Sequence, residues 1–199
     1  MKQKAGIIML LAGLTLVITI MESTTAFYGN VNGEHQNTLQ TKGSSLYLQE
    51  LFDPQDYWLP GETKQKELNF GNEGEQNQVI RFRVELKWKD KNGENWIPAT
   101  TTPVKINWTS AFEKEWTNFK EKEGWYYYNQ VLLAGSETKN IMESATFPSN
   151  FSNDTQADDF THATYCIKVY MEGLDVNSAV TNIEWGKTFT GETSLAWED

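Results

Sequence analysis

Strict alternation of apolar and polar side chains marks one segment as a half-buried β-strand. Over residues 79–88, large apolar side chains occupy every second position and charged side chains stand between them. The apolar set is Ile80, Phe82, Val84, Leu86 and Trp88. Successive side chains of a strand point to opposite faces, so one face is expected in a core and the other in water. Asn92-Gly93 then supplies residues that tolerate the positive φ of a closing turn.

A second segment, residues 163–171, repeats this alternation with a difference. Its first face is apolar, but its other face is only partly polar, because Cys166 and Tyr170 stand there beside Lys168. A strand with two such faces is typical of one that is covered on both sides. The pattern therefore predicts a strand that is covered on both faces.

Short strand-like segments separated by turn residues fill most of the remaining chain. The segments expected as strands are residues 44–51, 65–70, 78–88, 104–108, 125–133, 138–147 and 161–172. Many short strands with turn signals between them indicate an all-β fold, either a sandwich or a barrel.

Two segments depart from the strand pattern. Residues 109–122 place Phe112, Trp116 and Phe119 at helical spacing with charges between them, which predicts a short amphipathic helix docked on the sheets. Residues 176–185 are expected to form another turn or two of helix. Both are too short to hold a core of their own, so we interpret them as connections.

Four consecutive aromatic residues, Trp125, Tyr126, Tyr127 and Tyr128, suggest two roles. One interpretation is cross-strand packing with the tyrosine hydroxyls in water. The other is an aromatic interface with a partner.

The first residues of the chain are typical of an export signal. Two lysines precede an uncharged apolar run over residues 6–21, which is shorter than the roughly 18–20 residues that span a bilayer comfortably. Thr24 and Ala26 follow at the −3 and −1 positions of a peptidase site, so we expect cleavage between Ala26 and Phe27. An uncleaved membrane anchor is the alternative.

Beyond this signal, residues 1–26, the chain divides into two parts. Residues 27–43 are rich in Gly, Asn, Gln and Thr and cannot bury much of themselves, so we expect an extended arm. Residues 44–199 have a length that suits one domain.

The charge of the chain excludes some partners. The formal net charge is −10 at pH 7, and removal of a leader with two lysines and one glutamate makes it more negative. A protein of this charge repels phosphate backbones and acidic lipid headgroups. Nucleic acid and, after processing, the membrane are therefore not expected as partners.

The single cysteine, Cys166, rules out an intramolecular disulfide. An exported protein without disulfides is compatible with a Gram-positive surface. We interpret Cys166 as a small buried residue, with an intermolecular disulfide as the alternative.

The residue types needed for catalysis are absent in recognisable arrangements. His35 and His162 are the only histidines and lie in no zinc-binding motif, and no serine lies in a Gly-x-Ser-x-Gly elbow. We therefore expect no enzyme, no cofactor and no metal site. The loop with Asp154, Asp158 and Asp159 supplies oxygen ligands without EF-hand spacing, and calcium binding there remains a hypothesis.

Several motifs, taken in order, resemble one known family. They are Leu-Ala-Gly-Leu-Thr-Leu at 11–16, Leu-Pro-Gly-Glu at 59–62, the alternating strand to Trp88, and Gly-Trp-Tyr-Tyr-Tyr at 124–128 before Val-Leu-Leu at 131–133. Together they resemble the TasA, camelysin and BsaA group of Firmicute matrix proteins, most closely the BsaA-like branch. Proteins of this group are exported through a signal peptidase of the SipW type.

The resemblance implies a jelly-roll-like antiparallel β-sandwich with one or two short helices in its connections. It also implies a secreted homopolymer, located in the extracellular matrix or on the surface of a Gram-positive bacterium, whose fibres support biofilm. In such fibres the segment freed by signal removal adds as a strand to the next subunit. Carried onto this chain, the donor strand includes Phe27, Tyr28 and Val31.

Three classes of function follow. The leading hypothesis is a non-enzymatic subunit of a biofilm matrix fibre that polymerises head to tail. A camelysin-like surface metalloprotease is the second, and the absent zinc motif argues against it. A monomeric adhesin that binds its ligand through exposed aromatic residues, such as Trp96, Trp125 or Tyr126, is the third.

Overall fold

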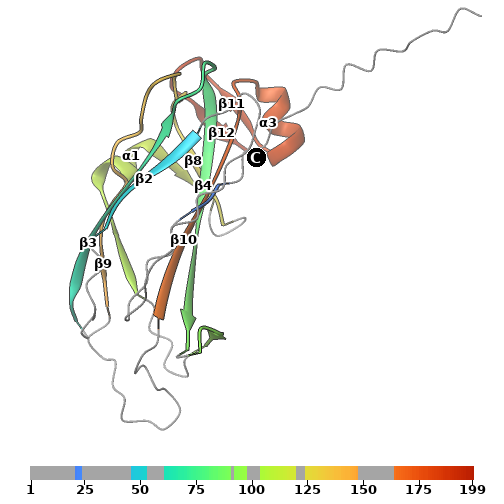
Figure 1. The fold of residues 1–199 in the computed structure, drawn as a ribbon. Helices are drawn as coiled ribbons and strands as arrows, with labels where there is room; N and C mark the ends of the chain where they lie inside the picture. Colours follow the sequence, from blue (N-terminus) through green and yellow to red (C-terminus); the bar gives the residue numbers. More distant parts are fainter. Residues whose placement is uncertain are drawn as a thin grey trace, which may run out of the picture.

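The computed structural model describes residues 21–23, 46–52, 61–90, 92–97, 104–119, 124–147 and 164–199. These residues form two large antiparallel sheets that face each other, and a small hairpin (Figure 1). Sheet A has the order β1 (Met21–Ser23), β10 (Thr164–Asp175), β4 (Gln78–Lys89), β8 (Tyr126–Tyr128), β7 (Trp116–Asn118), with β5 (Asn95–Trp96) paired to β4. Sheet B has the order β2 (Leu46–Phe52), β3 (Thr63–Asn72), β9 (Met142–Thr146), β6 (Lys105–Trp108). The expectation of an all-β fold is confirmed.

Aromatic side chains from both sheets meet in the main core. Phe82 of β4 is fully buried and its ring lies 5.1 Å from Phe70 of β3, 4.8 Å from Trp116 and 5.0 Å from Tyr126, between ring centroids. The three pairs are tilted, edge-to-face and stacked, respectively, and aromatic pairs of these kinds stabilise a core beyond the area that they bury. Phe82 thus joins the two sheets at the centre of the domain.

The alternation predicted for β4 holds along most of the strand. Ile80 and Phe82 are fully buried, and Val84 and Trp88 pack against the core clusters. Leu86 departs from the prediction, because 36% of its side chain remains exposed. The inner face of β4 is therefore less completely buried towards the end of the strand that pairs with β5.

The prediction that the strand over residues 163–171 is covered on both sides is confirmed for the described part. Ile167, Val169 and Met171 of β10 lie in the cores between the sheets. Cys166 and Tyr170, on the opposite face, are buried as well.

The amphipathic helix expected over residues 109–122 is shorter in the structure. Helix α1 (Ser110–Glu115) begins after Thr109, whose hydroxyl accepts a hydrogen bond from the Phe112 amide. At Trp116 the backbone becomes extended, with φ −130° and ψ 134°, and continues as β7 beside β8. Phe112 and Trp116 enter the main core, whereas Phe119 packs on the outer face of sheet A.

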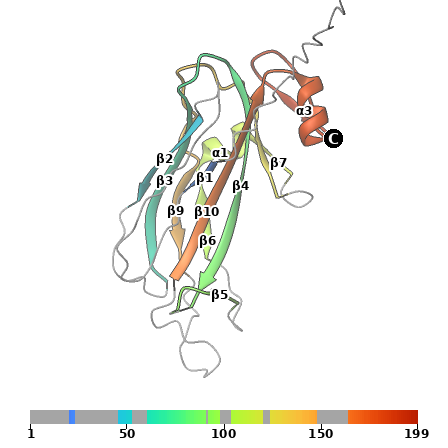
Figure 2. The same ribbon diagram turned by 45° about the vertical axis from the view of Figure 1, so that its right-hand side comes forward.

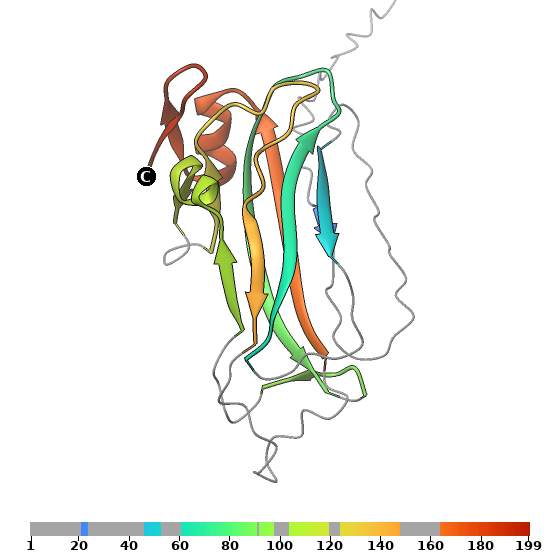
Figure 3. The same cartoon turned by 90° about the vertical axis from the view of Figure 1, so that its left-hand side faces the viewer.

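The C-terminal segment covers that outer face at one end (Figures 2 and 3). Helix α3 (Ser178–Trp185) is capped by the Asn177 side chain and ends at Gly186, whose φ of 65° suits glycine. The hairpin of β11 (Thr188–Thr190) and β12 (Ala196–Glu198) follows. The buried residues of this third cluster are Val79, Tyr127, Leu174, Trp185, Leu195 and Trp197. In the described part of the chain neither helix is long and apolar enough to cross a membrane.

Each segment expected as a strand overlaps an observed one, though several boundaries move. The segment over 125–133 shortens to Tyr126–Tyr128, while the strand expected over 65–70 lengthens to Thr63–Asn72. The helix suggested over 176–185 forms as α3. Strands β1, β5, β7, β11 and β12 were not expected.

Replacement of Phe82 by alanine is predicted to lower the free energy of unfolding by about 3–5 kcal/mol, because it removes a fully buried ring from the contact between the sheets. Leu86→Ala, on the same face of the same strand, is the matched control and should cost about 1 kcal/mol, since Leu86 is partly exposed. Urea unfolding followed by tryptophan fluorescence measures both. Equal losses in the two variants would show that the core is not centred on Phe82.

Candidate functional site

The candidate site is the outer edge of β10. One edge of this strand pairs with β4 in an unbroken register from Thr164↔Lys89 to Asp175↔Gln78. Its other edge carries β1, with Met21 opposite Met171, Glu22 opposite Tyr170 and Ser23 opposite Val169. In the described residues β1 therefore covers only a short part of this edge.

The position of β1 in the sequence makes this pairing a candidate for function. Met21–Ser23 lies on the N-terminal side of the Ala26–Phe27 bond that we expect the peptidase to cut. Cleavage there would remove β1 and leave the backbone groups of residues 169–171 without this strand partner. An uncovered strand edge presents N–H and C=O groups that pair readily with another extended segment.

Side chains on both faces hold this part of β10 in place. Val169 and Met171 point into the main core, and each is 1% exposed. On the outer face the Tyr170 hydroxyl donates a 2.7 Å hydrogen bond to Glu85, and the Arg83 guanidinium lies 4.4 Å from the centre of the Tyr170 ring. These contacts on both faces should keep the backbone of β10 in place when the strand on its outer edge is exchanged.

The charge of Glu85 adds to this arrangement. Hydrogen bonds from Lys87 and from Tyr170 lower the pKa of the Glu85 carboxyl, so its ionised form is favoured. Glu85 therefore accepts from both groups as a carboxylate at neutral pH.

A cationic–aromatic cluster stands beside the edge on the same face. The Arg81 guanidinium lies 4.2 Å from the centre of the Trp125 ring and 4.6 Å from that of Trp185. It donates hydrogen bonds of 2.8 Å and 2.6 Å to one carboxylate oxygen of Glu172 on β10, and a 2.8 Å bond to the Tyr127 hydroxyl. The single side chain of Arg81 on β4 thus contacts β10, β8 and α3 and stabilises their packing.

The inner side of β10 lies close to the start of β2. A Cβ atom added at Gly173 would lie 2.2 Å from Cδ1 of Leu46, the first residue of β2. Only glycine allows this approach without a shift of the neighbouring side chain. The start of β2 and the inner side of β10 are therefore neighbours in the fold.

The structure corrects the aromatic interface hypothesis for Tyr126, Tyr127 and Tyr128. All three side chains are buried, at most 5% exposed, so they belong to the subunit's own packing. Burial raises the pKa of Tyr126, and burial with the nearby Glu115 raises that of Tyr128 to about 12. Trp125 is half-buried under Arg81.

Other predicted residues lie outside the described part of the chain. These are the cleavage site Ala26 and Phe27, the donor residues Phe27, Tyr28 and Val31, the histidines His35 and His162, and the loop acids Asp154, Asp158 and Asp159. Cys166 is buried as expected, and burial raises the pKa of its thiol. Within the described ranges no three His, Cys, Asp or Glu side chains lie close enough together to hold a metal ion.

Two parts of this site escaped the sequence analysis. Residues 21–23 lie in the expected leader, and their sequence gives no signal of the pairing with β10. Arg81 was expected only as a solvent-facing residue, although its place opposite Glu172 in adjacent strands offered a signal for an ion pair.

Arg81→Ala is predicted to cost about 3 kcal/mol of unfolding free energy, because it leaves the largely buried Glu172 carboxylate without its guanidinium partner. Arg83→Ala is the matched control from the same face of β4 and should cost less than about 1 kcal/mol, since Arg83 is exposed. Chemical denaturation of the two variants measures the difference. A loss for Arg81→Ala as small as that for Arg83→Ala would contradict the role given to Arg81.

No family model, no curated protein and no solved structure matches this chain.

Proposed function

We propose that this chain is a secreted structural subunit of an extracellular biofilm matrix fibre. In this proposal the subunit polymerises head to tail when its processed N-terminal arm adds as a strand to the next molecule. The observation that carries the proposal is the pairing of β1 with β10, because β1 lies in the segment that the expected cleavage removes. Processing would then open an acceptor edge and free a donor arm in one step.

The donor and acceptor surfaces of such a contact differ, and this difference allows a polymer of subunits to grow. The donor belongs to residues 27–43 and the acceptor is the β10 edge, so each subunit offers one of each. Main-chain hydrogen bonds across the added strand provide affinity, as in other cases of β-augmentation. A contact between two different surfaces does not close on itself in a dimer and therefore propagates.

The order of strand pairing supports a jelly-roll-like sandwich within this proposal. Strand β7 pairs with β8, β6 pairs with β9, and β4 pairs with β10, so each pair encloses the previous one along the chain. A long hairpin rolled across two sheets produces this nested order, which double-sheet jelly rolls share. The strands β2 and β3 extend sheet B beyond the nested set.

The proposal includes export and processing. A SipW-type signal peptidase would cut between Ala26 and Phe27, and the mature chain would be held outside a Gram-positive cell by its own polymer. The subunit has no catalytic role in this account, and its partner is another copy of itself.

Three forms of the chain test the proposal by negative-stain electron microscopy and size-exclusion chromatography. Residues 27–199 should form fibres, because the β10 edge is open and the arm is present. Residues 21–199 should remain monomeric, because their own β1 covers the edge. Residues 44–199 should not polymerise, yet should shorten fibres of the 27–199 form, because they accept an arm without donating one.

Two matched variants of the 27–199 form examine the donor. Replacement of Phe27, Tyr28 and Val31 by serine should abolish fibres, since it removes the apolar side chains that would pack on the acceptor. Replacement of Asn30, Asn32 and Gln36 by serine should leave assembly unchanged. Fibres formed equally well by the 21–199 and 27–199 forms would refute the proposed acceptor, and a 27–199 form that stays monomeric would refute the polymer.

A further inference from the structure

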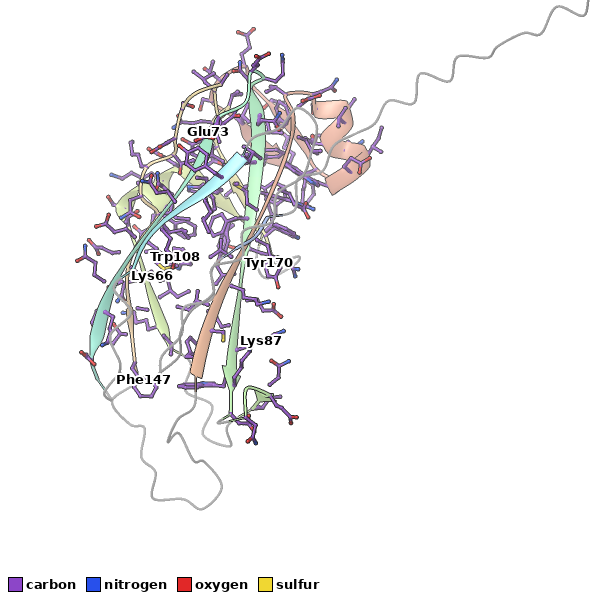
Figure 4. All side chains as sticks on the ribbon, viewed as in Figure 1. Lys66, Glu73, Lys87, Trp108, Phe147 and Tyr170 are labelled. Atoms are coloured by element: carbon purple, nitrogen blue, oxygen red, sulfur yellow. The ribbon has the colours of Figure 1, made fainter. Side chains whose placement is uncertain are left out.

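A lysine occupies a position in the sandwich interior where an apolar residue would be expected. On β3 the inward face carries Lys64, Lys66, Leu68 and Phe70, and the last two belong to the main core. The Lys66 side chain is fully buried. Figure 4 labels Lys66 among the side chains of the sandwich. Lys64 stands nearer the end of the strand, with its amine 3.6 Å from the more exposed Glu62 carboxylate.

The partner of Lys66 is a carboxylate on the neighbouring strand. In the register of β2 and β3, Phe52 lies opposite Lys66 and Glu50 lies opposite Leu68, so Glu50 and Lys66 are diagonal neighbours. The Lys66 amine contacts Oε1 of Glu50, whose side chain is 9% exposed. The two groups are therefore held together with little access to water.

Burial changes which protonation state this pair prefers. Desolvation lowers the pKa of Lys66 to about 7, so burial favours the neutral amine far more than in an exposed lysine. Isolated charges are costly in such a site, and a proton passed from the ammonium to the carboxylate yields a neutral amine beside a carboxylic acid. A neutral amine is a nucleophile, and a carboxylic acid is an electrophile that carries its own leaving group.

We propose that Lys66 and Glu50 condense to an intramolecular amide that cross-links β3 to β2. The Lys66 Nζ attacks Glu50 Cδ, a new N–C bond forms, and one Cδ–O bond of the carboxyl group breaks. The departing hydroxyl takes a proton from the attacking amine and leaves as water. Atoms and charge balance without an oxidant or any other reactant, and the dry surroundings of Lys66 disfavour hydrolysis of the product.

The cross-link has a mechanical consequence for the fibre, although its existence does not rest on the fibre proposal. Strand β2 begins at Leu46, immediately after the N-terminal part of the chain, and is the edge strand of sheet B. Force transmitted through the arm of a fibre subunit would enter the domain at β2. A covalent bond to β3 would prevent that edge strand from being peeled away.

Intact-mass spectrometry of the purified full chain after complete denaturation tests the cross-link, because an ion pair does not survive denaturation and an amide does. The expected mass is lower than that of the sequence by one water molecule. Trypsin does not cleave after an acylated lysine, so digestion should yield residues 43–64 joined to residues 65–81. An unshifted mass together with a free peptide of residues 67–81 would overturn the proposal.

Variants locate the bond. The double variant Lys66→Met/Glu50→Leu replaces the pair by apolar side chains of similar size, leaves no buried charge unpaired, and should fold and show the mass of the unlinked chain. Each single variant leaves one buried group without its partner and should be less stable, but it should also show the mass of the unlinked chain. Lys64→Met is the matched control and should keep the deficit of one water, because Lys64 stands beside Glu62. A deficit that persists in folded Lys66→Met would place the lost water elsewhere and contradict the assignment.

Discussion

The antiparallel pairing of β4 with β10 is the interaction on which the rest of the structure depends. It runs without a break along both strands, from Thr164↔Lys89 to Asp175↔Gln78. Its inner face supplies Phe82 and Met171 to the core between the sheets, and its outer face receives the C-terminal helix and hairpin. Because backbone pairing, the apolar core and the Arg81 cluster all fix the same two strands, β10 keeps its position independently of what lies on its other edge.

In the proposed fibre, that independence would allow the free edge of β10 to exchange β1 for a strand of another subunit. A strand that is fixed on one side by a full ladder of hydrogen bonds can lose a short neighbouring strand at little cost in the stability of the domain. Its uncovered backbone N–H and C=O groups then favour pairing with a new strand. Proteolysis makes such an exchange irreversible, because the removed segment is no longer tethered at high local concentration. In the proposed fibre, the β10 edge of a sandwich without disulfides would stay paired with β1 before cleavage. It would bind a strand of another subunit only after cleavage.

The sequence was most informative where one face of an element meets water. The alternation along β4 and β10 predicted both strands and nearly all of their inward side chains, since burial on one face imposes a period of two. It failed at Trp116, where pairing with Tyr128 overrides the local helical spacing and turns the chain into a strand. The burial of the β8 tyrosines was not predicted, because it depends on segments distant in sequence: Tyr126 and Tyr128 lie in the main core between the sheets, and the C-terminal segment covers Tyr127 on the outer face. Lys66 could not be placed from its type, because a lysine at a core position contradicts the pattern on which such placement relies.

Amide hydrogen exchange at residues 169–171 is the most direct test of the central claim that the β10 edge passes from β1 to the arm of another subunit. The amides that face this edge should exchange slowly in a chain that retains Met21–Ser23, quickly in the cleaved monomer, and slowly again in the fibre. Amides of β4 should remain protected in all three states. Edge amides of β10 that stay protected in the cleaved monomer, or that stay exposed in the fibre, would contradict the account.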